Sequence, residues 1–407
     1  MAVTEQTVSL TPETVARVQA ELRALGVEGW LLFNFNGNNP VASKLLGLPA
    51  LTRRYFVYIP AEGTPIALTH RIEQQPWSTW LGEKRIYSLW RELDTELKAL
   101  LEGKGRIAME YTPNDAVPYV DRVPAGMLDL VRASGVGEVV SSGDLVSAFY
   151  AVWGDEGLAS HRRATDAVRE TAHQAFRRVA DAVREGRTIT EWEVRQWIQG
   201  ELARRGLKVG GDSIVAVNDH AANPHYAPSA EHHAEIREGD LLLIDLWGKE
   251  NDGAVYGDQT WMAYVGETIP ERLSTIFATL VKARDAGVEL LRARHAAGES
   301  VRGYEVDDAV REVVEAGGHG AHVFHRTGHS IDRELHGSGP NIDNMETRDD
   351  RVLIPGVGFS VEPGIYIAGD IGFRTEINVY MGPDGPEVTV DRPQRALYPL
   401  LAADPFA

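Results

Sequence analysis

LLLIDLWGKENDGAVYGD, residues 241–258, is the stretch of sequence from which the fold can be worked out. The apolar run from Leu241 to Ile244 predicts a buried strand, and this strand carries Asp245 into the protein interior. Asn, Asp and Gly at positions 251–253 are typical turn residues, so we expect the chain to reverse there. The returning strand carries a second aspartate, Asp258. The stretch therefore predicts a β-hairpin with one carboxylate on each arm.

The spacing of the two aspartates predicts that they share one face of the sheet. If the turn is centred between Asn251 and Asp252, Asp245 lies directly opposite Asp258. Two carboxylates this close in a sheet interior repel each other, and burial disfavours their charged forms. A divalent metal ion is the natural group to hold both of them ionised.

Composition narrows the classes of function. The chain has 407 residues, enough for two domains, and 43% hydrophobic with 25% charged residues is ordinary for a globular protein. The formal charge of −18 at pH 7 argues against nucleic acid or an anionic membrane surface as the main partner. This charge does not argue against a small-molecule substrate as the partner. Because the chain has no cysteine, any metal must be held by oxygen and imidazole nitrogen.

Two features of the sequence bear on its location. Residues 1–20 are polar and contain no apolar signal core. No later run approaches the roughly 20 apolar residues that a membrane span needs. We therefore expect a cytoplasmic protein with no membrane partner.

Residues 1–155 are expected to form an α/β domain. Thr11 followed by Pro12 predicts the start of a helix. Further helical patterns occur near Asp94 and Asp121. Strand patterns occur at residues 29–35, 54–60, 64–70, 106–111 and 137–142. None of these strands ends in a glycine-rich phosphate loop, so this domain shows no chemistry of its own.

Residues 156–407 are expected to form an α+β domain that begins with helices. A helical pattern runs from Glu156 to about Glu185. Thr190 followed by Glu193 has the spacing of a capping box, which predicts the start of the next helix. Two more helical patterns follow the first hairpin, at about 270–294 and 305–318.

The second domain repeats one order of elements. Each half runs from helices through a histidine-containing segment to a hairpin with two carboxylates. In the second half these are Glu362 and Glu376, with the turn at 368–372. This order predicts an internal duplication about a pseudo-twofold axis, which would bring four carboxylates to one point. Four carboxylates and an imidazole suit a pair of divalent ions a few Å apart, with Mn, Co or Zn favoured.

One of the thirteen histidines, His329 in the segment TGHSI, is the predicted metal ligand. His225 and His336 are candidates for neutral hydrogen-bond donors beside the metals. His325 lies four residues before His329, but no glutamate follows it, so the pair does not form the HExxH helix of zinc proteases. His232 lies in a polar loop and is expected to be solvated.

Other hydrolase motifs are missing from the sequence. A serine hydrolase needs a G-x-S-x-G elbow, and the segment HGSGP at 336–340 approaches that pattern only by chance. A P-loop is also absent. The sequence therefore favours a metal-dependent reaction over a serine hydrolase or a P-loop enzyme.

Five motifs, in this order, resemble a known family: NPHY at 223–226, LLLID with GDQT at 241–260, TGHSI at 327–331, VEPGIYI at 361–367 and GFRTE at 372–376. Together they resemble the pita-bread-fold metallopeptidases. The α/β domain in front makes the chain similar to the branch with aminopeptidase P, prolidase and creatinase. The resemblance implies a creatinase-like N-terminal domain over 1–155 and a pita-bread catalytic domain over 156–407.

The resemblance also implies two divalent ions per subunit, with Mn favoured and Zn or Co as alternatives. It implies that Asp245 chelates one ion, that Asp258 and Glu376 bridge both, and that His329 and Glu362 complete the second site. A metal-bridging hydroxide would be the nucleophile. Glu362 would double as the general base.

Three further residues take roles from the resemblance. His225 and His336 would donate hydrogen bonds to the scissile carbonyl and the tetrahedral oxyanion. Arg374 would either orient the site or bind a substrate carboxylate.

The implied substrate is a small peptide with proline in the second position, cleaved at its N-terminal Xaa-Pro bond. We favour a dipeptidase, because Trp247 and Trp261 are expected to crowd the site. The alternatives are an aminopeptidase P that acts on longer Xaa-Pro peptides and, less favoured, a creatinase-like member that is not a peptidase. The resemblance also implies a homodimer.

Overall fold

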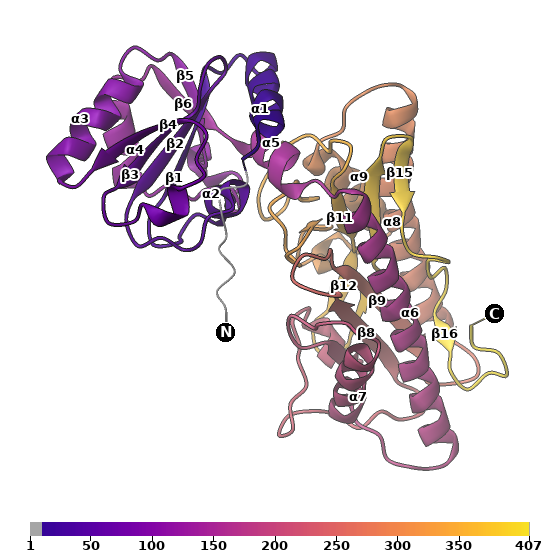
Figure 1. Cartoon of the computed structure of the whole chain (residues 1–407). Coiled ribbons are helices and arrows are strands. Elements are labelled where there is room, and N and C mark those ends of the chain that lie inside the picture. Colours follow the sequence, from indigo (N-terminus) through magenta and orange to yellow (C-terminus); the bar gives the residue numbers. More distant parts are fainter. Residues whose placement is uncertain (1–9, 407) are drawn as a thin grey trace. The chain divides into compact units, whose positions relative to one another are not determined.

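The computed structural model describes residues 10–406, which divide into two compact units (Figure 1). Unit 1 ends at Tyr150 and unit 2 begins at Ala151. The predicted boundary, after residue 155, lies five residues further along the chain, at the start of the first long helix of unit 2. The polar segment that bears on location includes residues 1–9, which lie outside the described residues.

Unit 1 is built on a six-stranded mixed sheet with the order β4-β3-β2-β1-β5-β6. Its strands are β1 (Gly29–Asn34), β2 (Tyr55–Pro60), β3 (Ile66–His70), β4 (Glu83–Tyr87), β5 (Arg106–Met109) and β6 (Glu138–Ser141). All but β4 lie in stretches predicted as strands. The sequence of β4, EKRIY, is mostly charged and lies at the edge of the sheet. An edge strand is often charged, which explains why its signal is weak.

Helices cover both faces of this sheet. They are α1 (Pro12–Ala24), α2 (Pro40–Leu46), α3 (Trp90–Leu101), α4 (Ala125–Ala133) and α5 (Gly143–Val146). Trp30 and Leu32 of β1 belong to one apolar core with α1 and α2, whereas Leu31 and Phe33 belong to another with α3 and α4. Short helical turns lie at Gln75–Trp77, Pro113–Asp115 and Ser147–Ala151. Helix α1 begins as predicted, because the Thr11 side chain accepts a hydrogen bond from a backbone N–H of the first turn.

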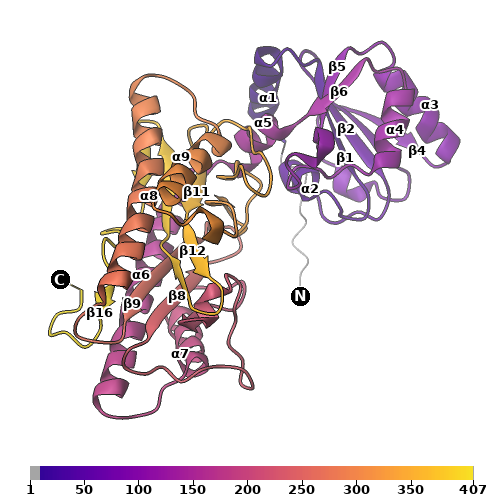
Figure 2. The ribbon, with the colours of Figure 1, turned by 180° about the vertical axis from the view of Figure 1, so that it is seen from behind.

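Unit 2 has four long helices: α6 (Asp155–Arg184), α7 (Glu191–Arg204), α8 (Glu271–Ala296) and α9 (Gly303–Ala316). All four lie where the sequence predicts them. The capping box is present, since Thr190 Oγ1 accepts from the Glu193 N–H (3.2 Å) and the Glu193 carboxylate accepts from the Thr190 N–H (3.0 Å). Helices α8 and α9 pack against each other (Figure 2). Within residues 10–406, no helix is long and apolar enough to cross a membrane.

The first hairpin of unit 2 lies in a four-stranded sheet with the order β16-β9-β8-β7. The strands are β7 (Ile214–Val217), β8 (Leu241–Gly248), β9 (Gly257–Tyr264) and β16 (Tyr398–Pro399). The register of the hairpin differs from the prediction. Asp245 pairs with Thr260, and Asp258 pairs with Trp247, so the two aspartates are not directly opposite. The offset is two residues, which preserves the alternation of faces, and both aspartates still lie on one face.

The turn of this hairpin explains the difference in register. The N–H of Ala254 bonds to the carbonyl of Asn251 (3.1 Å), which centres the turn between Asp252 and Gly253. The predicted centre lies one residue earlier, between Asn251 and Asp252. A shift of one residue at the turn moves every cross-strand partner by two residues.

The second hairpin of unit 2 is interrupted in the middle. Strands β10 (Ser330–Ile331), β11 (Gly358–Val361), β14 (Ile377–Gly382) and β15 (Gly385–Val388) form one sheet, and β12 (Gly364–Ile367) and β13 (Ile371–Arg374) form a separate pair. Glu362 follows β11, and Glu376 precedes β14. The pairing keeps one register on both sides of the interruption, so these two glutamates occupy facing positions.

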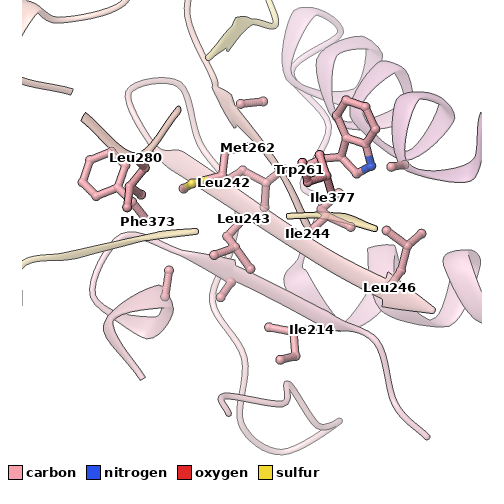
Figure 3. Packing of buried hydrophobic residues seen from close by; sticks show 14 of the residues in the cluster. Ile214, Leu242, Leu243, Ile244, Leu246, Trp261, Met262, Leu280, Phe373 and Ile377 are labelled. Atoms are coloured by element: carbon pink, nitrogen blue, oxygen red, sulfur yellow. The ribbon is translucent and has the colours of Figure 1, made fainter. Parts of the chain in front are cut away.

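The two faces of the β8–β9 hairpin differ in their contacts. Ile244, Leu246 and Trp261 lie on the face toward α6, and Figure 3 shows them among the buried apolar side chains. Trp261 is 1% exposed and lies edge-on to His173 of α6, with ring centroids 4.9 Å apart. The prediction that Trp261 crowds the site is therefore wrong. Its offset of three residues from Asp258 places it on the opposite face.

Candidate metal centre

Buried acidic side chains and one histidine converge beside the face of β8–β9 that carries the aspartates. Asp258 of β9, His329 just before β10 and Glu376 just before β14 each offer one ligand atom. These atoms all lie within 4.8 Å of one another, and all three residues are buried. Because the three residues come from distant parts of the sequence, the group exists only in the folded chain.

Glu362 joins this group through His329. The Nε2 atom of His329 lies 3.5 Å from Asp258 Oδ2 and 3.3 Å from Glu362 Oε1. Ser360 links the backbone to the same acid, since its Oγ accepts from the His329 N–H (2.9 Å) and donates to Glu362 Oε1 (3.0 Å). Gly328 permits this approach, because a Cβ there would lie 2.0 Å from the Ser360 carbonyl oxygen.

Asp245 is connected to the group through Arg374. Their Nη2 and Oδ2 atoms are 2.5 Å apart, and both residues are buried. The Nε of Arg374 donates to Thr260 Oγ1 (3.0 Å), which donates to Glu376 Oε2 (2.9 Å). Its Nη1 donates to the Tyr366 hydroxyl (3.2 Å). Every guanidinium nitrogen thus has a partner in the chain, which favours the orienting role of Arg374 over the binding of a substrate carboxylate.

Three supporting residues were not identified from the sequence. Ser360 and Thr260 bond to the acids as described, and Asn378 Oδ1 accepts from the backbone N–H of Asp258 (3.0 Å). Each of the three lies two residues from a predicted ligand in the sequence. In a strand this spacing places a side chain on the same face as the ligand, and it is the signal that could have found them.

The carboxyl groups of the centre fit a bound cation. One oxygen each of Asp245, Asp258 and Glu376 is buried without a hydrogen-bond partner among residues 10–406. Burial raises the pKa of Asp245 to about 7 and also raises the pKa values of Asp258 and Glu376. Buried oxygens that lack donors and resist ionisation are stabilised by a nearby positive charge. The donor set of carboxylates with one imidazole fits divalent ions such as Mn, Co or Zn.

Glu362 behaves differently from the other acids. Burial acts to raise its pKa, but His329, His325 and Arg374 together hold the pKa of Glu362 below its usual value. Burial likewise acts to lower the pKa of His329, but the hydrogen bond to Asp258 and the charge of Glu362 raise it overall. Glu362 is therefore the acid of this group that is most readily ionised, and it can accept a proton.

The two predicted donor histidines lie at the edge of the group. The ring centroid of His336 is 4.3 Å from that of His329, with 70° between the ring planes. Burial and the neighbouring His329 lower the pKa of His336 to about 4, so its ring is neutral at neutral pH. The charge of His225 adds to the same lowering. His225 is exposed, on the loop that follows β7.

His325 hydrogen-bonds to the Tyr366 hydroxyl (2.7 Å) and to a backbone carbonyl (2.6 Å), so both of its ring nitrogens are engaged. His232 is exposed, as its polar surroundings predict.

Comparison with known proteins agrees with this geometry. Residues 163–383 match the family model for metallopeptidase family M24. The probable dipeptidase PepE of Mycobacterium bovis is 31% identical over 331 residues, which cover 80% of each chain. The Xaa-Pro dipeptidase of Lactobacillus delbrueckii subsp. lactis is 32% identical over 209 residues, which cover 51% of this chain and 52% of that protein.

A solved structure shows the same fold. The crystal structure of dipeptidase PepE from Mycobacterium ulcerans has a TM-score of 0.67 and 21% sequence identity, and the match covers 94% of this chain and 96% of that one. The resemblance to the pita-bread metallopeptidases is thereby confirmed. Since the family model spans more than half of the chain and a relative is 31% identical over 80% of it, the chain belongs to metallopeptidase family M24.

Proposed function

We propose that the chain is a dinuclear metal-dependent peptidase that hydrolyses Xaa-Pro dipeptides. The observation that carries this proposal is the convergence of Asp258, His329 and Glu376 within 4.8 Å in a chain of a metallopeptidase family. The names of two relatives, a probable dipeptidase and an Xaa-Pro dipeptidase, support the substrate class. Residues 156–407 would form the catalytic domain.

Five residues would hold the two ions: Asp245, Asp258, His329, Glu362 and Glu376. The unpartnered carboxylate oxygens support this assignment. We favour Mn over Zn and Co, because four of the five ligands are carboxylates. When bound, the ions would supply Lewis-acid polarisation of the scissile carbonyl and activation of a water molecule.

Glu362 would move the proton of the reaction. Its Oε1 accepts from Ser360, so Oε2 is the atom that would take a proton from water and return it to the proline nitrogen as the amide bond breaks. The lowered pKa of Glu362 supports this role, because the general base must be ionised before it can act.

His225 and His336 would stabilise the developing negative charge on the substrate carbonyl oxygen. The lowered pKa of His336 supports a neutral ring that donates a hydrogen bond without carrying charge. Removal of one such donor typically lowers kcat by about 10²–10³-fold. Arg374 would act through Asp245, whose direction it fixes.

Trp247 supports a preference for dipeptides. It pairs with Asp258 across the hairpin, so its indole stands on the same face as the two aspartates. Trp247 and Leu335 pack against one apolar cluster, and Leu335 directly precedes His336. We infer that Trp247 limits the space beyond the second residue of the substrate.

Metal removal and replacement tests the proposed function. The purified protein is analysed for bound metal, treated with a chelator and reloaded with Mn, Co or Zn, and release of the first residue from Xaa-Pro and Xaa-Pro-Xaa peptides is measured. We expect activity to disappear on chelation and to return with metal. Full hydrolysis by metal-free protein would contradict the proposal, and faster cleavage of the longer peptides would identify an aminopeptidase P.

A matched pair of variants isolates the metal centre. Asp258→Asn changes a predicted ligand, whereas Asp252→Asn changes an exposed aspartate in the loop of the same hairpin. We expect Asp258→Asn to lose metal and activity and Asp252→Asn to keep both. The same loss in both variants would show that the hairpin, and not the ligand, is responsible.

Four finer proposals accompany the function. The two halves of unit 2 would be related by duplication, which the repeated order of helices, histidine segment and hairpin supports. Unit 1 would be a creatinase-like domain. The homodimer and the cytoplasmic location stay predictions, and light scattering and cell fractionation would test them.

A further inference from the structure

A buried carboxylate outside the metal centre holds the loop that carries His225. Glu191 is the first residue of α7 and is 0% exposed. The loop runs from the end of β7 at Val217 to Ala234, and we call residues 218–234 the His225 loop. The roles proposed above make no use of Glu191.

Glu191 closes the His225 loop at both ends and in its middle. Its carboxylate accepts from the backbone N–H groups of Val217 (2.8 Å) and Ala234 (2.7 Å), which flank or end the loop. Within the loop, His220 Nδ1 donates to both oxygens (3.0 Å each), and the Tyr226 hydroxyl donates to one (2.7 Å). Hydrogen bonds to a carboxylate are roughly twice as strong as those between neutral groups. One side chain therefore holds three residues of the loop and the strand residue that precedes it.

The His225 loop is also joined to the metal centre. The carbonyl of Pro224 accepts from Arg374 Nη1 (3.3 Å), and Arg374 is the partner of Asp245. Ala221 lies directly against β13, because a Cβ at Gly372 would be only 1.8 Å from the Ala221 carbonyl oxygen. The loop backbone is thus held against the hairpin that carries the second pair of acids.

His225 stands between these two anchors. Pro224, on one side, bonds to Arg374, and Tyr226, on the other, bonds to Glu191. The side chain of His225 is exposed, so packing does little to fix its direction. The position of its imidazole therefore depends on the backbone, which Arg374 holds on one side and Glu191 on the other.

We propose that Glu191 is a positioning residue that holds His225 at the metal centre through Tyr226 and His220. This inference rests on the proposed function, because His225 is there the donor to the substrate carbonyl. A displacement of about 1 Å of a group that acts in the transition state lowers the rate by about 10²-fold. A residue of α7 would thus influence the rate without contacting the substrate.

A double-mutant cycle tests this proposal. Glu191→Gln keeps the size of the side chain but replaces an acceptor with a donor, which then faces backbone N–H groups. We expect kcat for an Xaa-Pro dipeptide to fall by about 10²-fold, with a smaller change in KM. In a His225→Ala background the same substitution should lower kcat by no more than about 2-fold, because no donor remains to be misplaced. Equal losses in both backgrounds would overturn the proposal.

Two further variants separate positioning from general damage. Tyr226→Phe removes a single hydroxyl and keeps the ring, and we expect about a 10-fold loss of kcat. Glu193→Gln changes an exposed acid two residues along α7 and should leave kcat unchanged. Calorimetric titration with Mn²⁺ should give affinities within about 2-fold of the wild type for all three. A loss of metal affinity in Glu191→Gln would show that the His225 loop acts on the metal centre through Arg374 and not only through His225, and it would overturn the proposal.

Limited proteolysis distinguishes failure of this proposal from failure of the proposed function. If the wild type cleaves no Xaa-Pro peptide, the proposed function fails, but the loop can still be examined. We expect Glu191→Gln to be cut within residues 218–234 at least 10-fold faster than Glu193→Gln, since opening the loop costs less without its anchor. Equal protection of the two variants would show that Glu191 does not hold the loop.

Discussion

Arg374 and Asp245 form a buried ion pair, with 2.5 Å between Nη2 and Oδ2. The same guanidinium donates to Thr260, whose hydroxyl donates to Glu376. One cation of the chain thus reaches an acid from each of the two hairpins. It offsets part of their charge, and we propose that it also sets their direction.

Loss of Arg374 should weaken metal binding. In Arg374→Met the acids keep their places in the sequence but lose the group that orients them. We expect Mn²⁺ affinity, measured by titration calorimetry, to fall by about 10–100-fold. Arg272→Met is the matched control, because the ion pair of Arg272 with Asp370 is exposed. Equal affinities for the two variants would remove Arg374 from the orienting role.

Loss of the carboxylate of Glu362 should abolish turnover. Glu362→Gln cannot take up a proton, so we expect kcat to fall by at least about 10²-fold. His232→Ala, which changes an exposed ring on the His225 loop, should have little effect on kcat. Metal content is measured in both variants, because Glu362 is also a predicted ligand. The reverse ranking of the two variants would show that their roles were assigned wrongly.

Trp247 should control the length of the substrate. Trp247→Ala opens the face beside Asp258, and we expect the ratio of kcat/KM for Xaa-Pro-Xaa to that for Xaa-Pro to rise by about 10-fold, which corresponds to about 1.4 kcal/mol. Trp261→Phe changes an indole on the opposite face and should alter stability without altering this ratio. An unchanged ratio in Trp247→Ala would remove the structural basis for the dipeptide preference.

Glu110 should make the stability of unit 1 depend on pH. This residue is 0% exposed and accepts from Trp30 Nε1 (2.6 Å), Asn39 Nδ2 (2.7 Å) and Ser142 Oγ (3.1 Å). Burial outweighs these hydrogen bonds and raises the pKa of Glu110 from 4.5 to about 7. The folded unit therefore binds the proton more tightly than the unfolded chain. The resulting stabilisation is complete below pH 4.5 and is lost as the pH rises through about 7.

The Glu110→Gln variant measures this contribution. In the wild type, unit 1 should lose on the order of 3 kcal/mol of stability between pH 5 and pH 8. Glutamine cannot ionise, so the variant should lose much less stability over the same range. Hydrogen exchange of peptides from β1 and β5 reports on unit 1 by itself. An equal pH dependence in the wild type and the variant would show that another group is responsible.

Elements with strong periodic patterns could be predicted from the sequence. The helices of unit 2 and the capping box at Thr190 follow from apolar spacing and local hydrogen bonding, which act over a few residues. The charged edge strand β4 could not be recognised, because its place in the sheet is set by its neighbour β3. The predicted register of the first hairpin is wrong by two residues, because the register depends on which residues form the turn.

Some residues of the candidate site could be predicted from the sequence, and others could not. Asp245 and Glu362 stand out because each follows an apolar run, where a solvated acid is not expected. Ser360, Thr260 and Asn378 do not stand out by themselves, because polar residues are common in strands. Only their spacing of two residues from a predicted ligand distinguishes them. Arg374 could be placed near the site, but the contacts that favour one of its two roles exist only in the folded chain.

The interruption of the second hairpin has a consequence for how the protein is made. Beside the break, the backbone N–H of Glu362 bonds to the Thr327 carbonyl (2.7 Å) and not to the facing strand, and β13 packs on β8 and β9. The predicted ligands of the two hairpins therefore come together only after Glu376 has been synthesised. At about 5–20 residues per second, this is roughly 6–24 seconds after Asp258. Until β13 has been made, the apolar strand β8 lacks its cover, so we expect metal capture to follow the synthesis of the second hairpin.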